Sequence, residues 1–71
     1  QEVFDELKKL RLQLAKEKGK PPYVIFHNKT LEQMAIARPT TKEALGEISG
    51  VGESKLKLYG KKFMEVIESF N

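Results

Sequence analysis

The residues able to do acid–base or metal chemistry in this 71-residue chain are few and scattered. There is one histidine, His27, and no cysteine. The acidic residues are spaced like helix surfaces and helix caps, and no phosphate-binding loop or metal-ligand spacing occurs. A lone histidine is more often structural or solvent-facing than a ligand. We therefore predict that the chain alone is not an enzyme, and that it has no catalytic residue, metal site or cofactor of its own.

One aromatic residue has the surroundings of a nucleic-acid contact. Tyr23 lies in the apolar segment Pro21–Phe26, between two stretches with helical periodicity. Two successive prolines fix the backbone and remove two donors, so we predict a non-helical connection here. We expect Val24, Ile25 and Phe26 to enter the core while Tyr23 stays partly exposed; the alternative is a buried Tyr23 whose hydroxyl bonds to the backbone. An exposed ring beside lysines can stack on the bases of a single strand.

Positive charge gathers around this segment, although the net charge of the chain is only +3. Between residues 8 and 29 there are seven basic residues and one acidic residue, Glu17. The basic residues of this segment are Lys8, Lys9, Arg11, Lys16, Lys18, Lys20 and Lys29. A local field of this kind steers a polyanion, whereas the alternative is that these lysines are ordinary solvated helix faces. We expect Lys8, Arg11, Lys18 and Lys20 to supply positive potential around Tyr23.

The turn Gly50-Val51-Gly52 is a second candidate contact. Its glycines permit a sharp turn, and the helix that follows begins with unpaired N–H groups and a positive dipole end. Together with Lys55 these groups could receive a phosphate, as in the helix-hairpin-helix turn of non-specific DNA binders, which this pattern resembles. Glu53 beside the turn would repel a phosphate, so a purely structural turn is the alternative.

Apolar periodicity predicts two long helices that enclose two short ones, with no strand. The first long helix covers residues 3–18, with Arg11 next to its apolar stripe and Gly19 at its end. The short helices are predicted to begin at Thr30 and Thr40, each followed three residues later by Gln or Glu as in a capping box. The last helix covers residues 53–70. Gly60 within it should permit close approach of a neighbour.

In order along the chain, these pieces resemble the HRDC (helicase and RNase D C-terminal) domain family. The segments that carry the resemblance are Leu7-x-x-Leu10-Arg11, Pro21–Phe26, Thr30-Leu31, Arg38-Pro39-Thr40, Ile48-Ser49-Gly50-Val51-Gly52 and Tyr59-Gly60. Each segment alone is weak evidence for the family, but their order and spacing match over nearly the whole chain. The variant with Pro-Pro-Tyr-Val-Ile-Phe looks most like the domain that ends bacterial RecQ DNA helicases.

The resemblance implies an all-α, compact bundle of four to five helices. It implies that residues 1–71 are a single HRDC domain excised from a longer helicase, which fits a chain that begins with Gln1 rather than Met. The implied role is accessory: a monomer that helps a RecQ-type helicase grip single-stranded or branched DNA in repair and recombination, beside the other helicase domains. ATP, Mg and zinc would belong to other parts of the parent protein. The implied location is the bacterial cytoplasm, near the nucleoid and away from membranes.

Two other functions stay open at this point. The domain could dock on other helicase domains or on repair proteins, for which the acidic residues Glu43, Glu47, Glu65 and Glu68 are suited. It could also be the equivalent domain of an RNase D-like nuclease and bind RNA. Stacking and lysines serve both nucleic acids, so the sequence does not separate DNA from RNA.

Overall fold

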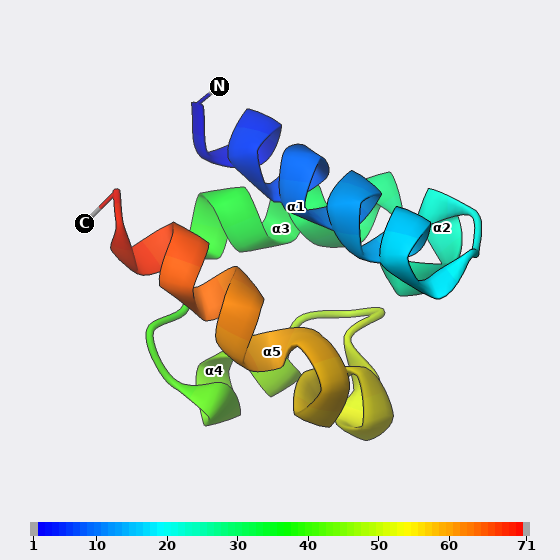
Figure 1. Cartoon of the computed structure of the whole chain (residues 1–71). Helices are drawn as coiled ribbons and strands as arrows, with labels where there is room; N and C mark the ends of the chain where they lie inside the picture. Colours follow the sequence, from blue (N-terminus) through cyan, green and yellow to red (C-terminus); the bar gives the residue numbers. More distant parts are fainter. Residues whose placement is uncertain (1, 71) are drawn as a thin grey trace.

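Two long helices packed against one another, α1 (Glu2–Lys18) and α5 (Gly52–Glu68), form the frame of the fold (Figure 1). The computed structural model describes residues 2–70. Along the chain, the long helices are separated by three shorter ones: α2 (Pro22–Ile25), α3 (Asn28–Ala37) and α4 (Lys42–Gly46). Residues 2–70 contain no strand. The predicted all-α bundle is therefore confirmed, with five helices. No helix within this range is both long and apolar enough to span a bilayer.

The core is built from the predicted stripes of the long helices and from the segment between them. Val3, Leu7, Leu14 and Ala15 of α1 are buried, as are Tyr59, Phe63 and Ile67 of α5. The middle of the chain contributes Ile25, Phe26, Leu31, Met34, Ala35, Leu45 and Val51. Burial of each large apolar side chain favours folding by about 1.5–3 kcal/mol relative to leaving it exposed, before the entropy cost of ordering the chain.

The segment Pro21–Phe26 differs from its prediction in two respects. Pro22–Ile25 form one helical turn, because proline is tolerated in the first turn of a helix, where its missing N–H has no partner to lose. The Val24 N–H donates to Pro21 O at 3.1 Å and closes the turn. Ile25 and Phe26 are fully buried as predicted, but Val24 is 36% exposed. A helical turn points successive side chains in different directions, so the three apolar residues do not all face the core.

Both predicted capping threonines are wrong in register. α3 begins at Asn28, with His27 at its N-cap, so Thr30 lies inside the helix. Thr30 is buried, and its hydroxyl donates to Ser49 O at 3.0 Å, which ties α3 to the turn before α5. Thr41 rather than Thr40 caps α4, because its hydroxyl accepts from the Ala44 N–H at 3.1 Å. Capping-box spacing shows that a cap is possible, but it does not choose between adjacent threonines.

The glycines of the last two elements behave as predicted. Gly50 has φ 92° and Gly52 has φ 66°, both in the left-handed region, with the buried Val51 between them. At Gly60 a methyl group would lie 3.4 Å from the Cδ2 of Leu45 in α4, and 2.9 Å from the Cδ1 of Leu56 in its own helix. The absence of a side chain at Gly60 therefore permits the close approach of α4 to α5.

Candidate nucleic-acid interface

Tyr23 lies on the α2 turn and is exposed to solvent, on a backbone segment that is restricted on both sides. Tyr23 is 60% exposed, so the prediction of an exposed ring is confirmed. Pro21 and Pro22 restrict the chain before it, while Ile25 and Phe26 are buried behind it. The ring stacks against that of His27, with centroids 6.1 Å apart and planes inclined by 29°. Tyr23 is thus part of a two-ring exposed surface rather than of the core.

Basic side chains from α1 and α3 line the same surface. Tyr23 borders an open hollow with Arg11, Pro22, His27, Asn28 and Lys29. Arg11 and Pro22 also border the next hollow along α1, which adds Lys8, Lys9, Leu12 and Asp5. The fold therefore brings together three residues predicted as contacts, Lys8, Arg11 and Tyr23. We call the area formed by Lys8, Arg11, Tyr23, His27 and Lys29 the Tyr23 surface.

The Tyr23 surface continues towards the glycine turn. His27 and Lys29 border a third hollow, which reaches Ser49 and Gly50 and is also lined by Thr30, Glu32 and Gln33. The Thr30–Ser49 hydrogen bond described above fixes the turn against α3 at this point. The two contacts predicted separately from the sequence, at Tyr23 and at Gly50, are joined through His27 and Lys29.

Arg11 links the Tyr23 surface to the core. Its side chain is half-buried, and Nη1 donates to Phe26 O at 3.0 Å, as expected for an arginine beside the apolar stripe. Its Nε is buried without a hydrogen-bond partner. Burial lowers the pKa of the Arg11 guanidinium, but a guanidinium stays charged at physiological pH even so. Arg11 therefore brings a permanent positive charge to both hollows while it holds the Phe26 backbone in place.

Lys9 contributes less free charge than its neighbour Lys8. Its ammonium lies 2.9 Å from the carboxylate of Glu6, one turn earlier on α1. The hydrogen bond to Glu6 and its negative charge raise the pKa of Lys9. The Lys8 ammonium instead lies 5.1 Å from the centroid of the Phe4 ring. The Glu6 carboxylate offsets part of the positive charge of Lys9, so Lys8 is the better donor to a ligand on this side of α1.

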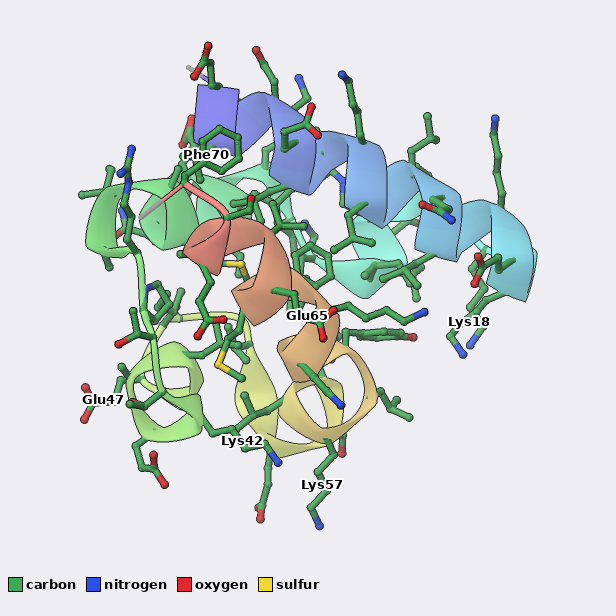
Figure 2. The ribbon with its side chains drawn as sticks, turned by 60° about the vertical axis from the view of Figure 1, so that its left-hand side comes forward. Lys18, Lys42, Glu47, Lys57, Glu65 and Phe70 are labelled. Carbon is green, nitrogen blue, oxygen red and sulfur yellow. The ribbon has the colours of Figure 1, made fainter. Side chains whose placement is uncertain are left out.

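Lys18 and Lys55 are placed around a different aromatic cluster. The Lys18 ammonium lies 5.6 Å from the Tyr59 ring centroid, and that of Lys55 lies 5.8 Å from the Phe26 ring centroid. The Phe26 ring meets Tyr59 and Phe63 edge to face. Figure 2 shows Lys18 at the C-terminal end of α1. Cation–π contacts at distances of this kind hold both lysines over core rings, and neither lysine lines the hollows of the Tyr23 surface.

The remaining predicted contacts are Lys20, Gly50 and Gly52, and of these only Gly50 lines one of the three hollows. Lys20 is exposed directly before Pro21, and its backbone N–H donates to Ala15 O at 2.9 Å. Gly50 lines the third hollow, whereas Gly52 is exposed but borders none of the three. The structure therefore groups Gly50 with His27 and Lys29 rather than with Lys55. Roles in DNA binding for all of these residues stay predictions.

Sequence reasoning missed His27 and Lys29 as members of the site. Both carry a readable signal: Lys29 belongs to the basic segment, and His27 follows Tyr23 by four residues. The sequence gives no sign that the rings of Tyr23 and His27 would meet, because Val24, Ile25 and Phe26 separate the two residues.

Comparisons with known proteins identify the family. The family model described as "HRDC domain" matches residues 1–67. The chain is 38% identical over 69 residues to the ATP-dependent DNA helicase RecQ of Bacillus subtilis strain 168, covering 97% of this chain and 12% of that protein. It is 39% identical over 67 residues to the RecQ helicase of Haemophilus influenzae, covering 94% of this chain and 11% of that protein.

A solved structure shows the same fold. "D. radiodurans RecQ HRDC domain 3" superposes with a TM-score of 0.92 at 35% identity, covering 96% of this chain and 90% of that one. The chain thus corresponds to a small segment of the helicases and to nearly all of an isolated domain. The family resemblance drawn from Pro21–Phe26 and the glycine turn is confirmed, and this chain belongs to the HRDC domain family.

Proposed function

We propose that this domain binds single-stranded DNA as an accessory module of a RecQ-type DNA helicase. The observation that carries the proposal is the exposed Tyr23 ring, stacked on His27 and bordered by Arg11 and Lys29. The names of the relatives support a helicase as the parent and DNA as the nucleic acid. Because the chain spans about an eighth of those proteins, we assign ATP hydrolysis and unwinding to other parts of the parent.

A base would stack on Tyr23 while Lys8, Arg11 and Lys29 neutralise the phosphates on either side. The prolines before Tyr23 and the buried residues behind it keep the platform stiff, so little conformational entropy is lost on binding. Stacking on Tyr23 uses the face of a base, which every base has, and we therefore expect slight sequence preference. Three neutralised phosphates give a log–log salt slope of about −2, and binding of micromolar affinity or weaker at physiological salt.

The test is a titration of the domain with fluorescein-labelled oligothymidine, followed by anisotropy. Stacking contributes roughly 1–3 kcal/mol per base, so Tyr23→Ala should weaken binding by about five- to a hundredfold. Tyr23→Phe should bind almost as tightly as the wild type, because the ring carries the effect. Val24→Ala is the matched control, since Val24 is also exposed on α2 but has no ring. Equal affinity of Tyr23→Ala and wild type would overturn the proposal.

A protein-docking role is the second candidate, and exposed apolar side chains away from the Tyr23 surface favour it. Ile36 of α3 is 72% exposed and Leu58 of α5 is 65% exposed. The acidic residues suggested for this role do not form one patch, because Glu47, directly after α4, and Glu65 on α5 lie apart (Figure 2). Absence of oligothymidine binding at low salt, with the domain folded, would favour docking over DNA binding.

A further inference from the structure

His27 carries the imidazole of the Tyr23 surface, and the proposed function gives this side chain no contact with the ligand. It is exposed, and its ring forms the stacked pair with Tyr23. Together with Lys29, it joins the Tyr23 hollow to the hollow at Gly50, since both residues border the two hollows. A single strand of DNA that extends from one hollow to the other would pass over this imidazole.

The groups that face His27 come from four parts of the fold. Arg11 of α1 and Lys29 of α3 bring positive charge, and Tyr23 of α2 brings a neutral ring. Glu32 of α3 is the carboxylate among the residues that line the two hollows with His27, and the backbone at Ser49 and Gly50 closes the far side. Two cations and one carboxylate therefore line the two hollows together with His27.

We infer that His27 is a second nucleic-acid contact, which stacks beside Tyr23 and, when protonated, binds a backbone phosphate; this inference rests on the proposed single-strand binding. Histidine gains its positive charge as the pH falls from about 8 to 5. A bound phosphate favours the charged imidazole, so DNA binding is coupled to proton uptake, and affinity rises as the pH falls. The ligand class is a single-stranded polyanion with stacking bases, and the proton is a second, coupled ligand.

The size of the effect follows from one additional phosphate contact. Each phosphate neutralised on a single strand adds about −0.7 to the slope of log affinity against log salt. The slope for the wild type should therefore be steeper by about 0.7 at pH 5.5 than at pH 8.0. The gain in affinity from this contact should therefore be about fivefold larger at 50 mM than at 500 mM salt.

The experiment measures oligothymidine binding by anisotropy at both pH values and over a salt series, because thymine bases do not titrate in this range. The chain has a single histidine, so one substitution removes the imidazole charge. His27→Phe keeps a ring beside Tyr23 and should lose the pH dependence that the wild type shows. His27→Ala should lose the pH dependence and also bind more weakly at pH 8.0. Far-UV circular dichroism at both pH values checks that each variant is folded.

The outcomes separate this inference from the proposal beneath it. Binding that depends on Tyr23 but has the same pH response in wild type and His27→Phe would overturn the role of His27 and leave single-strand binding intact. A wild-type affinity that does not change with pH would do the same. Absence of binding at 50 mM salt at both pH values would overturn both.

Discussion

Replacement of Gly50 by alanine should cost far more stability than the same change two residues later. Both glycines have positive φ, which an L-residue adopts at a cost of about 1–2 kcal/mol. Around Gly52 there is nothing within 4 Å of an added Cβ, so only this backbone cost applies. At Gly50 the added Cβ would collide with the Oγ1 of Thr30. The Thr30 hydroxyl must then move and give up its bond to Ser49 O.

The loss of that bond leaves the hydroxyl of the buried Thr30 without its partner, at a further cost of about 1–3 kcal/mol. We therefore expect Gly50→Ala to lower the free energy of unfolding by about 2–5 kcal/mol, against about 1–2 kcal/mol for Gly52→Ala. Urea unfolding followed by far-UV circular dichroism measures both. A cost of 2–5 kcal/mol is large for a domain of this size, so unfolding midpoints should differ clearly between the two variants.

Thr30→Ala tests the cause. This substitution loses the Ser49 hydrogen bond by itself, but it also removes the atom with which the new Cβ collides. In the Thr30→Ala background, Gly50→Ala should therefore cost only the backbone strain of about 1–2 kcal/mol, the same as Gly52→Ala. Equal costs for Gly50→Ala with and without Thr30 would refute the collision, as would equal costs for Gly50→Ala and Gly52→Ala in the wild-type background.

Two further substitutions test other parts of the structure. Thr41→Ala should lower the free energy of unfolding by about 1 kcal/mol, because it removes the cap of α4. Thr40→Ala should change the free energy of unfolding by no more than about 0.5 kcal/mol. The reverse order of the two costs would support the cap position predicted from the sequence. Lys55→Glu should weaken oligothymidine binding if the turn region binds a phosphate, and wild-type affinity in this variant would leave the turn purely structural. Lys57→Glu is the matched control, because the Lys57 side chain extends into solvent from the same helix (Figure 2). Since the Lys55 ammonium also lies 5.8 Å from the Phe26 ring centroid, far-UV circular dichroism checks that the variant is folded.

The long helices were predictable because their signals are redundant. In α1 the apolar residues recur over four turns, acidic residues occupy its first turn, and Gly19 with φ 65° ends it. Several independent features therefore agree on one element, and an error in any single feature moves a boundary by only a residue or two. The boundaries of α5 differ from the prediction by as little: the helix begins at Gly52, where Glu53 was predicted, and ends at Glu68, where Phe70 was predicted.

The short elements were mispredicted because their structure is decided by distant contacts. Thr30 has the sequence surroundings of a cap, but its hydroxyl bonds to Ser49, nineteen residues away. Burial of Ile25 and Phe26 similarly holds Pro22–Ile25 in a helical turn that four residues would not form alone. Local patterns do not contain either interaction.

The candidate site was predictable in its centre but not in its extent. Exposure of Tyr23 followed from stiff prolines before it and more apolar residues after it. The sequence gives the density of lysines along the chain, but not the face of the fold on which each side chain lies. Lys18 and Lys55 lie over the rings of Tyr59 and Phe26, while Lys29, which was counted only as charge, borders the Tyr23 hollow.

Arg11 shows why stability and binding must be tested at different residues of the Tyr23 surface. Its guanidinium holds the Phe26 carbonyl and also lines the two hollows on either side of Pro22. Truncation of Arg11 would free the backbone behind the α2 turn, so Tyr23 would lose both a neighbouring charge and part of its rigid support. A loss of DNA binding in such a variant has two causes that a single affinity cannot separate.

Tyr23, His27 and Lys29 are exposed, and no side-chain hydrogen bond holds them in the described part of the chain. Substitutions at these three residues therefore report on the ligand, whereas substitutions at Arg11 report on the fold and the ligand together.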